Sequence, residues 1–184
     1  MTELSEPWAH PVTSRPIPVA ATTAVVLALL CWRIGLAPEL AAYLYLGVVG
    51  VALAYIDIAL KRLPDPLTLP SYVIGAALLG LAFDGARFTH GLIGMVACFL
   101  LYAVQWIIAP GQLGLGDVKL SGVLGLYLGW LGLTAWTTGV LAGFLLGGCY
   151  ALALLVTRRA GRKSTIPFGP FMLAGALVGI LLHG

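Results

Sequence analysis

The sequence predicts an all-α integral membrane protein, a bundle of about seven transmembrane helices. Of its 184 residues, 60% are hydrophobic and only 9% are charged, whereas an ordinary soluble domain has about 25% charged residues. So few charged side chains cannot cover a soluble surface, and the composition also excludes a disordered or collagen-like chain. Lysine and arginine form no block long enough to indicate nucleic-acid binding, and no CxxC pair suggests a zinc site.

A helix that crosses the hydrocarbon core of a bilayer needs about 20 mostly apolar residues. Seven stretches meet this condition or come close to it. The expected helices span residues 17–36, 40–60, 67–83, 91–109, 118–135, 136–156 and 166–182. We expect them to form one transmembrane domain over residues 17–184, preceded by a short disordered tail over residues 1–16.

The individual stretches differ in character. The second, fourth and sixth have the strongest apolar signal, whereas the first contains Arg33 near its end and the fifth is rich in glycine. No small-residue cleavage site follows the first stretch, so we expect a retained helix and not a signal peptide. Glycines at a spacing of four, at 125 and 129 and at 139, 143 and 147, predict close packing of helices in lipid.

The distribution of basic residues predicts the orientation, because loops rich in lysine and arginine stay in the cytoplasm. With seven helices and a cytoplasmic N-terminus, the far side receives only Arg33 and Arg87. The cytoplasmic side then receives Arg15, Lys61, Arg62, Lys119, Arg158, Arg159, Arg162 and Lys163. This asymmetry supports both the orientation and the number of helices.

Three of the seven acids are informative: Asp57, Asp65 and Asp117. Asp57 lies inside the second apolar stretch, where a carboxylate is costly and normally faces the bundle interior for a functional reason. It also precedes Lys61 by four residues, so an interfacial ion pair is an equally good interpretation. Asp117 follows Gly114-Leu115-Gly116, and this segment taken alone favours a helix N-cap.

The predicted topology places Asp57 and Asp117 at the same cytoplasmic end of the bundle. Two acids held close together cannot both ionise easily, so the pKa of one would rise. Such a pair can share one proton, so that one carboxylate activates water while the other protonates a substrate carbonyl. This chemistry needs no cofactor and no metal.

A proline-rich segment lies between the second and third apolar stretches. Its sequence is Leu63-Pro64-Asp65-Pro66-Leu67-Thr68-Leu69-Pro70. Three prolines in this segment predict a rigid, non-helical link. Asp65 is interpreted first as a turn residue, which with Pro64 would shape the rim of a site.

Together these segments resemble the type IV prepilin peptidases, membrane aspartic proteases that are also called leader peptidases. The resemblance extends from about residue 40 to the C-terminus. The matching segments are Ile56-Asp57, Leu63-Pro64-Asp65, Leu67-Thr68-Leu69-Pro70, Gly114-Leu115-Gly116-Asp117-Val118-Lys119-Leu120 and Ile166-Pro167-Phe168-Gly169-Pro170.

The resemblance implies a role for several of these residues. Asp57 and Asp117 match the two catalytic aspartates of the family. Gly114 and Gly116 match glycines that would let an extended substrate backbone approach, and Lys119 matches a lysine that would tune the acid pair electrostatically. Family members hydrolyse the bond after a glycine at the end of the short basic leader of prepilins or pseudopilins, at the cytoplasmic face of the bacterial inner membrane. The implied partners are these substrates and membrane lipids.

Many family members also methylate the new N-terminus, using a domain with paired CxxC motifs. Nothing in the sequence matches that domain, so we expect a peptidase-only form without zinc. Two other functions stay open. One is a presenilin-like GxGD intramembrane protease, and the other is a small transporter or channel that uses Asp57 and Asp117 as intramembrane carboxylates.

Overall fold

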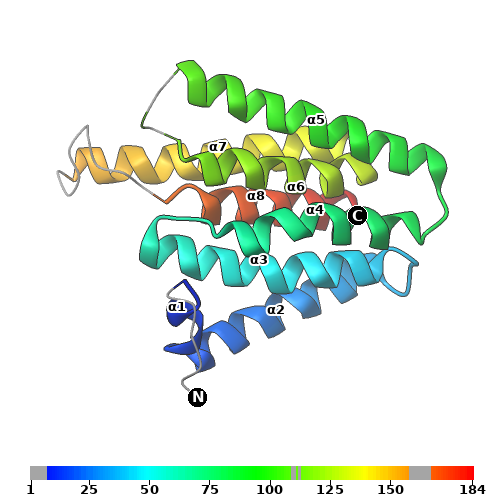
Figure 1. The fold of residues 1–184 in the computed structure, drawn as a ribbon, viewed down its shortest axis with the longest axis horizontal. Coiled ribbons are helices and arrows are strands. Elements are labelled where there is room, and N and C mark those ends of the chain that lie inside the picture. Colours follow the sequence, from blue (N-terminus) through cyan, green and yellow to red (C-terminus); the bar gives the residue numbers. More distant parts are fainter. Residues whose placement is uncertain (1–7, 109–110, 112, 158–166) are drawn as a thin grey trace.

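The computed structural model describes residues 8–108, 111, 113–157 and 167–184. Seven long helices, preceded by the single turn α1, run alternately in opposite directions through this part of the chain (Figure 1). The elements are α1 (His10–Thr13), α2 (Pro16–Ile34), α3 (Leu40–Leu60), α4 (Asp65–Gly80), α5 (Gly85–Ile108), α6 (Leu115–Leu131), α7 (Leu133–Val156) and α8 (Gly169–His183). We call the end where α3, α5 and α7 finish and α4, α6 and α8 begin the carboxylate end, and the other the opposite end.

Each of the seven expected stretches contains one helix, but several boundaries differ. The division expected between residues 135 and 136 lies instead at Gly132, whose φ of 107° ends α6. The expectation was wrong because the apolar pattern continues through Gly132, and hydropathy cannot show a turn that glycine permits. The tail expected over residues 1–16 is also partly helical, because α1 forms a single turn and α2 begins at Pro16. Proline suits the first position of a helix, where its missing N–H would have no partner within the helix. Residues 1–7 lie outside the described residues.

The expected non-helical link over residues 64–70 is also corrected. Only Pro64 is extended, with φ −71° and ψ 129°, and α4 begins at the next residue. Pro66 lies in the first turn, where backbone N–H groups have no partner within the helix, and Pro70 is accommodated inside the helix. The proline pattern predicted a helix break where the structure has a helix start.

Four helices, α2, α3, α5 and α7, are long and apolar enough to cross a membrane. The helices α4, α6 and α8 have 16, 17 and 15 residues, which corresponds to about 22–26 Å at 1.5 Å per residue. This is shorter than the hydrocarbon core of about 30 Å. The described chain therefore forms a helical membrane bundle of unequal helices.

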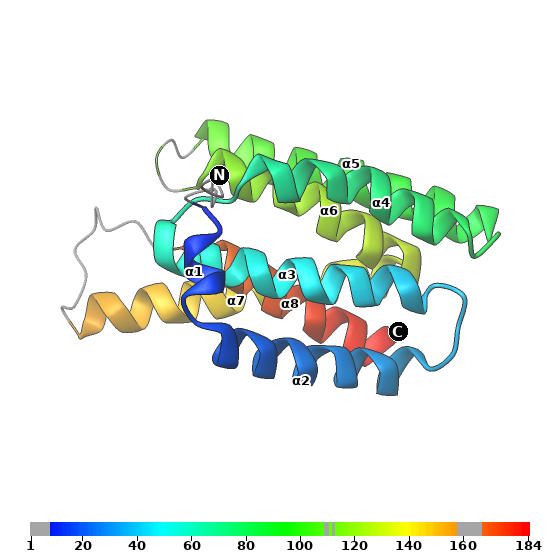
Figure 2. The same ribbon diagram turned by 60° about the horizontal axis from the view of Figure 1, so that its bottom comes forward.

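The short helix α6 is the centre of the bundle, and it packs against α4, α5, α7 and α8 (Figures 1 and 2). Nearly all of its residues are buried, from Asp117 to Trp130. Glycines set its close contact with α5: a Cβ atom placed on Gly94 would lie 2.6 Å from the carbonyl oxygen of Gly125. A Cβ atom on Gly129 would lie 2.6 Å from the carbonyl oxygen of His90. The close helix packing predicted from glycine spacing is therefore present.

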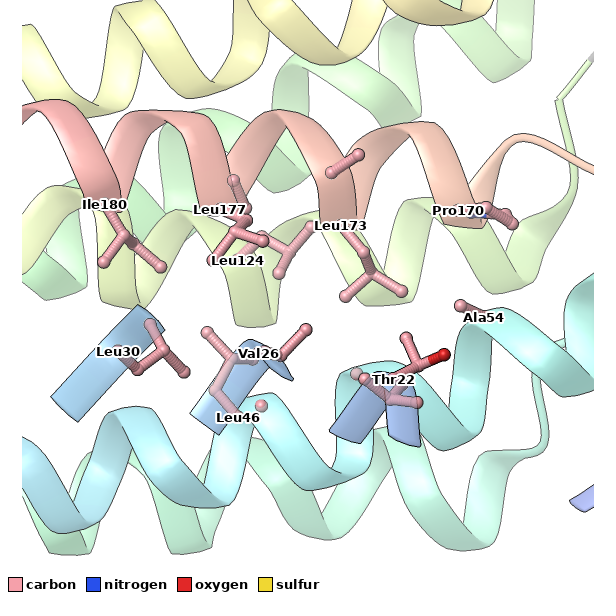
Figure 3. Close-up of a pocket in the computed structure, with 15 residues that line it drawn as sticks. Thr22, Val26, Leu30, Leu46, Ala54, Leu124, Pro170, Leu173, Leu177 and Ile180 are labelled. Atoms are coloured by element: carbon pink, nitrogen blue, oxygen red, sulfur yellow. The ribbon is translucent and has the colours of Figure 1, made fainter. Parts of the chain in front are cut away.

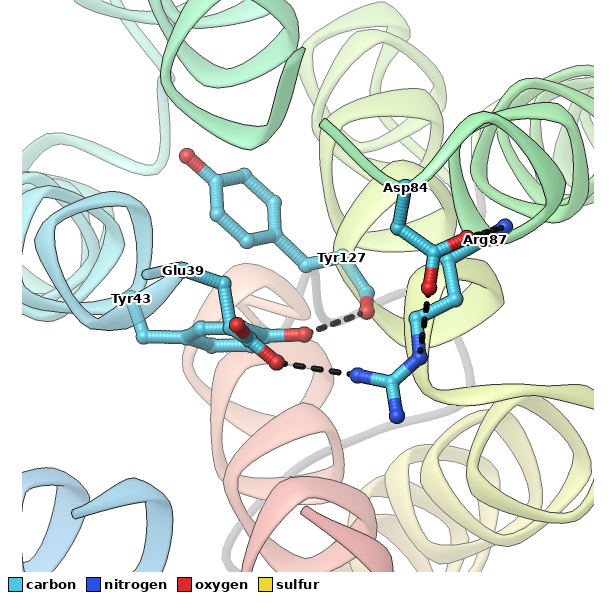
Figure 4. Close-up of polar contacts among 5 residues, drawn as sticks. All are labelled: Glu39, Tyr43, Asp84, Arg87 and Tyr127. Atoms are coloured by element: carbon cyan, nitrogen blue, oxygen red, sulfur yellow. Dashed lines mark hydrogen bonds and ion pairs between the residues drawn. The ribbon is translucent and has the colours of Figure 1, made fainter. Parts of the chain in front are cut away.

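Polar contacts join the loops at the opposite end (Figure 4). The Arg87 guanidinium lies 3.0 Å from Glu39 and 3.5 Å from Asp84, which joins the α2–α3 loop to the α4–α5 loop. The Tyr43 hydroxyl donates a hydrogen bond of 2.9 Å to the carbonyl oxygen of Tyr127. Acids that the sequence places in outer loops therefore have a structural role.

Candidate active site

Asp57 lies in the last turn of α3 with only 4% of its surface exposed. Its Oδ2 atom accepts a hydrogen bond of 3.0 Å from the backbone N–H of Gly169, the first residue of α8. The N-terminus of a helix carries a partial positive charge, so this contact stabilises a carboxylate. A Cβ atom at position 169 would lie 2.8 Å from the same oxygen, so only glycine fits there without a shift.

Asp117 is the third residue of α6 and is 8% exposed. Its Oδ2 atom accepts a hydrogen bond of 3.1 Å from the backbone N–H of Gly114. The interpretation of Asp117 as the N-cap residue is wrong, because Gly114 is the N-cap and Asp117, three residues later, accepts a hydrogen bond from the N-cap N–H. The other oxygen, Oδ1, is buried and has no hydrogen-bond partner among the described residues. A buried carboxylate oxygen without a partner is costly, and such groups mark functional sites.

The structure brings Asp57 and Asp117 together at the carboxylate end. Asp57 lies in the last turn of α3 and Asp117 in the first turn of α6, and both of these turns are at that end. The start of α6 approaches the link after α3 at Gly116, because a Cβ atom on Gly116 would lie 2.9 Å from the Cβ atom of Leu63 in that link. Gly116 therefore sets the separation between the two acid-bearing segments, and its expected role in admitting a substrate backbone stays a prediction.

Lys119 and Asp65 form an ion pair across the site. The Lys119 Nζ atom lies 2.7 Å and 2.9 Å from the two carboxylate oxygens of Asp65. The pair joins the first turn of α6 to the first turn of α4, directly after Pro64. The backbone of Lys119 is also held by α4, because its carbonyl oxygen accepts a hydrogen bond from the Tyr72 hydroxyl. Lys119 thus contacts Asp65, and its expected electrostatic effect on the acid pair stays a prediction.

Two groups of the site were missed by the sequence reasoning. Gly169 lies in the segment 166–170, which resembles the family, but the resemblance assigned no role to this glycine. Tyr102 of α5 is 2% exposed and close enough for the charge of Asp117 to act on it. Its ring stacks on Phe144 at a centroid distance of 5.1 Å, and Phe168 lies 6.3 Å away. Tyrosine in an apolar helix is common, so no sequence signal distinguished Tyr102.

A cavity of about 830 Å³ lies at the carboxylate end, and neither Asp57 nor Asp117 is among the residues that line it. Ile56 and Gly116, the residues directly before Asp57 and Asp117, form part of its wall. Its other walls come mainly from the α3–α4 link and the start of α6, with Trp8 from the N-terminal segment, and they include the charged residues Lys61, Arg62, Asp65 and Lys119. The charged and backbone groups of these walls suit a polar, extended chain near the segments that carry the two acids. The predicted basic cluster 158–163 and Ile166 lie outside the described residues.

Comparison with known proteins identifies several relatives. The chain is 33% identical over 145 residues to the prepilin leader peptidase/N-methyltransferase of Aeromonas salmonicida (strain A449), which covers 76% of this chain and 48% of that protein. It is 33% identical over 181 residues to the protein of that name from Dickeya chrysanthemi, covering 96% and 60% respectively. The corresponding protein of Pseudomonas aeruginosa is 31% identical over 172 residues, covering 89% and 57%.

The chain spans about half the length of the curated relatives it matches. No solved structure matches it. The sequence model of the type IV leader peptidase family matches residues 44–152. This range includes Asp57, Asp65, Asp117 and Lys119 and covers more than half of the chain. The chain therefore belongs to the type IV leader peptidase family.

Proposed function

We propose that this protein is a membrane aspartic endopeptidase that removes the leader peptide from prepilin-like substrates. The observation that supports this most directly is the pair of buried carboxylates at one end of the bundle. Asp57 and Asp117 each have one oxygen held by a backbone N–H. The names of the relatives, which are prepilin leader peptidases, favour the same reaction.

The proposed reaction is the addition of water to a peptide bond. One carboxylate accepts a proton from water, whose oxygen attacks the carbonyl carbon, while the other carboxylic acid donates a proton to the carbonyl oxygen. The tetrahedral intermediate then collapses, the C–N bond breaks, and the leaving amine takes a proton from the acid pair. The two acids act as one unit that shares a proton. The unpaired Oδ1 atom of Asp117 is suited to contact water or substrate.

We place the polar leader in the cavity of about 830 Å³ at the carboxylate end, and the following apolar segment in the bilayer. The cleaved bond then follows a glycine at the boundary between these two environments. A glycine before the cleaved bond would let the substrate backbone lie close to the first turn of α6, which bounds the cavity. The substrate would be a prepilin or pseudopilin that is anchored in the same membrane.

We also propose that the carboxylate end faces the cytoplasm of a bacterial inner membrane. Lys61, Arg62 and Lys119 lie at this end, and the start of α2 follows Arg15 there. Basic residues next to membrane helices favour the cytoplasmic side. Arg33 and Arg87 lie at the opposite end, where both are engaged in contacts within the protein.

The central experiment is a cleavage assay with the purified protein and a prepilin from the same genome. Asp57→Asn and Asp117→Asn are each expected to lower the rate by at least about 100-fold, because each removes a group that must transfer a proton. Glu39→Gln is the matched control, since Glu39 is a buried acid at the opposite end. Product mass determines both the cleaved bond and the state of the new N-terminus, which we expect to be unmethylated.

Two results would contradict the proposal. One is a wild-type protein that is folded but inert on every native prepilin-like substrate. The other is continued cleavage by both asparagine variants. In either case the same variants are next tested for ion or solute flux in vesicles, because a transporter would also depend on Asp57 and Asp117. Cleavage within a membrane helix, and not at the leader, would instead favour a presenilin-like protease.

A further inference from the structure

A second, apolar cavity of about 210 Å³ lies between α2, α3 and α8, with Leu124 of α6 at its base (Figure 3). We infer that this cavity receives the first apolar turns of the substrate's membrane helix, the segment that directly follows the cleaved bond. This inference rests on the proposed function and adds the location at which the anchored part of the substrate is recognised.

The walls of the cavity are suited to aliphatic side chains. Leu173, Leu177 and Ile180 line it from α8 at helical spacing, and Val26 and Leu30 line it from α2 (Figure 3). The one hydroxyl among the lining side chains belongs to Thr22, which is already 3.0 Å from the Tyr55 hydroxyl. An apolar cavity of about 150 Å³ stays free of water and binds a benzene-sized group. This cavity can therefore hold about two apolar side chains.

One end of the cavity lies close to Asp57 in the chain and in the fold. Pro170 lines this end and directly follows Gly169, whose N–H holds Asp57. Ala54 lines it from α3, one turn before Asp57. From Pro170 to Ile180 the cavity follows α8 for about 15 Å at 1.5 Å per residue. A chain cut at the carboxylates would thus place roughly its next ten residues, in helical form, along this path.

The wall formed by α2 is the one most easily displaced. Leu30 is its only buried residue, and α2 lies at the edge of the bundle, away from α6 (Figure 2). Its contact with α3 at Gly47 is made by the ends of the Val26, Leu27 and Leu30 side chains and not by backbone. An outward movement of α2 would widen the cavity into a groove for a helix, which needs about 8–10 Å between helix axes, without disturbing the core around α6.

The first test compares two substrates in one protein. Ala174→Phe on α8 fills the cavity at its exposed rim, and Ala97→Phe on the exposed face of α5 is the matched control. Losing the burial of one aliphatic side chain corresponds to a KM increase of about tenfold or more for the full-length, membrane-anchored prepilin. A short water-soluble peptide that ends soon after the cleaved bond should keep its kcat/KM. The control should change neither.

The outcomes separate this inference from the proposed function. If Ala174→Phe leaves the KM of the anchored prepilin unchanged, the cavity is not the docking site, although cleavage itself still supports the peptidase. If the wild type cleaves neither substrate, the proposed function fails and this inference fails with it.

Cross-linking gives a second test that does not depend on the stability of one variant. The background lacks Cys31, Cys98 and Cys149 and contains Asp117→Asn to retain the substrate. A cysteine at Ala54 is expected to link to a substrate cysteine within the first turn after the bond, and one at Leu177 to a cysteine about two turns further on. Ala97→Cys on α5 is the control, and substrate cross-links that form from this position alone would overturn the inference. So would a cavity that yields only bound lipid by mass spectrometry and no substrate links.

Discussion

At the residue scale, the two acids owe their orientation to backbone groups and not to other side chains. Gly169 and Gly114 each donate an N–H to one carboxylate oxygen. A backbone donor at a helix start is rigid, so it holds the carboxylate in one position and leaves the second oxygen available. This arrangement explains why glycine recurs around the acids: a Cβ atom at either position would lie within 3.2 Å of a carboxylate oxygen.

Gly169→Ala tests this orientation. The added Cβ atom would lie 2.8 Å from the Asp57 Oδ2 atom, so the carboxylate must move. A displacement of about 1 Å in a catalytic group can lower the rate about 100-fold, and we expect a loss of that order in kcat. Gly148→Ala, which adds a Cβ atom in open space on α7, is the control. Normal kcat in a folded Gly169→Ala protein would show that the hydrogen bond does not position Asp57.

The ion pair between Lys119 and Asp65 makes a second prediction at this scale. Both side chains are partly exposed, 35% and 53%, so removing the pair should change stability by only about 0–1 kcal/mol. Lys119→Met and Asp65→Asn should lower activity to a similar extent, and the double variant should be no worse than either single one, because both remove the same contact. Rate against pH is the decisive measurement. A shift of the pH optimum in Lys119→Met alone would mean that the lysine acts directly on the acid pair.

At the scale of elements, α6 is the helix on which the site depends. It presents Asp117 and Lys119 in its first turn, and glycines along its length allow α5 to approach it closely. A helix of 17 residues that is almost fully buried is held by its neighbours and not by lipid. Loss of packing on α6 should therefore disturb the active site even when it occurs far from the acids.

Gly125→Ala is the direct test of that packing. Its Cβ atom would lie 2.6 Å from the Cβ atom of Cys98 and would also meet the α5 backbone at Gly94. Overpacking of this kind costs about 1–3 kcal/mol, which corresponds to a fall of roughly 2–12 °C in the midpoint of thermal unfolding for a chain of this size. Gly148→Ala should leave the midpoint unchanged or raise it, since glycine weakens a helix interior. Equal midpoints for the two variants would contradict the proposed role of the α5–α6 contact.

At the scale of the whole molecule, the alternation of seven helices determines which groups share an end. The ends of α3, α5 and α7 and the starts of α4, α6 and α8 lie at the carboxylate end, together with most of the described basic residues. The opposite end has ion pairs between loops and the contacts of Arg33 with the last carbonyl groups of α8. The site and its orientation are thus properties of the bundle and not of one motif.

Orientation can be tested with single cysteines in a variant that lacks Cys31, Cys98 and Cys149. Thr157→Cys lies at the carboxylate end and Ala86→Cys at the opposite end, and both positions are exposed. In intact spheroplasts a membrane-impermeant maleimide should label Ala86→Cys, and it should label Thr157→Cys only after lysis. Neither substitution removes a charge, so the basic residues that set topology stay in place. The reverse labelling pattern would place the acids outside the cytoplasm.

Much of this could be predicted from the sequence. Composition and apolar length determined the membrane class and the number of long helices, because lipid requires helices with internally paired backbone groups. Asp57 and Asp117 stood out because carboxylates are costly near apolar stretches. Errors arose at Gly132 and at residues 64–70, where a turn or a helix start depends on single backbone angles that hydropathy does not report.

The tertiary structure alone decided which groups meet. Apolar periodicity in lipid specifies the length of a helix, but not its rotation or its neighbours. It therefore could not show that Gly169 of α8 holds Asp57 or that Lys119 pairs with Asp65. Nor could glycine spacing show that α6, one of the shortest helices, lies at the centre. The sequence by itself indicated which residues are candidates for the chemistry, and packing of the helices decided their partners, because contacts between distant segments depend on how whole surfaces fit together.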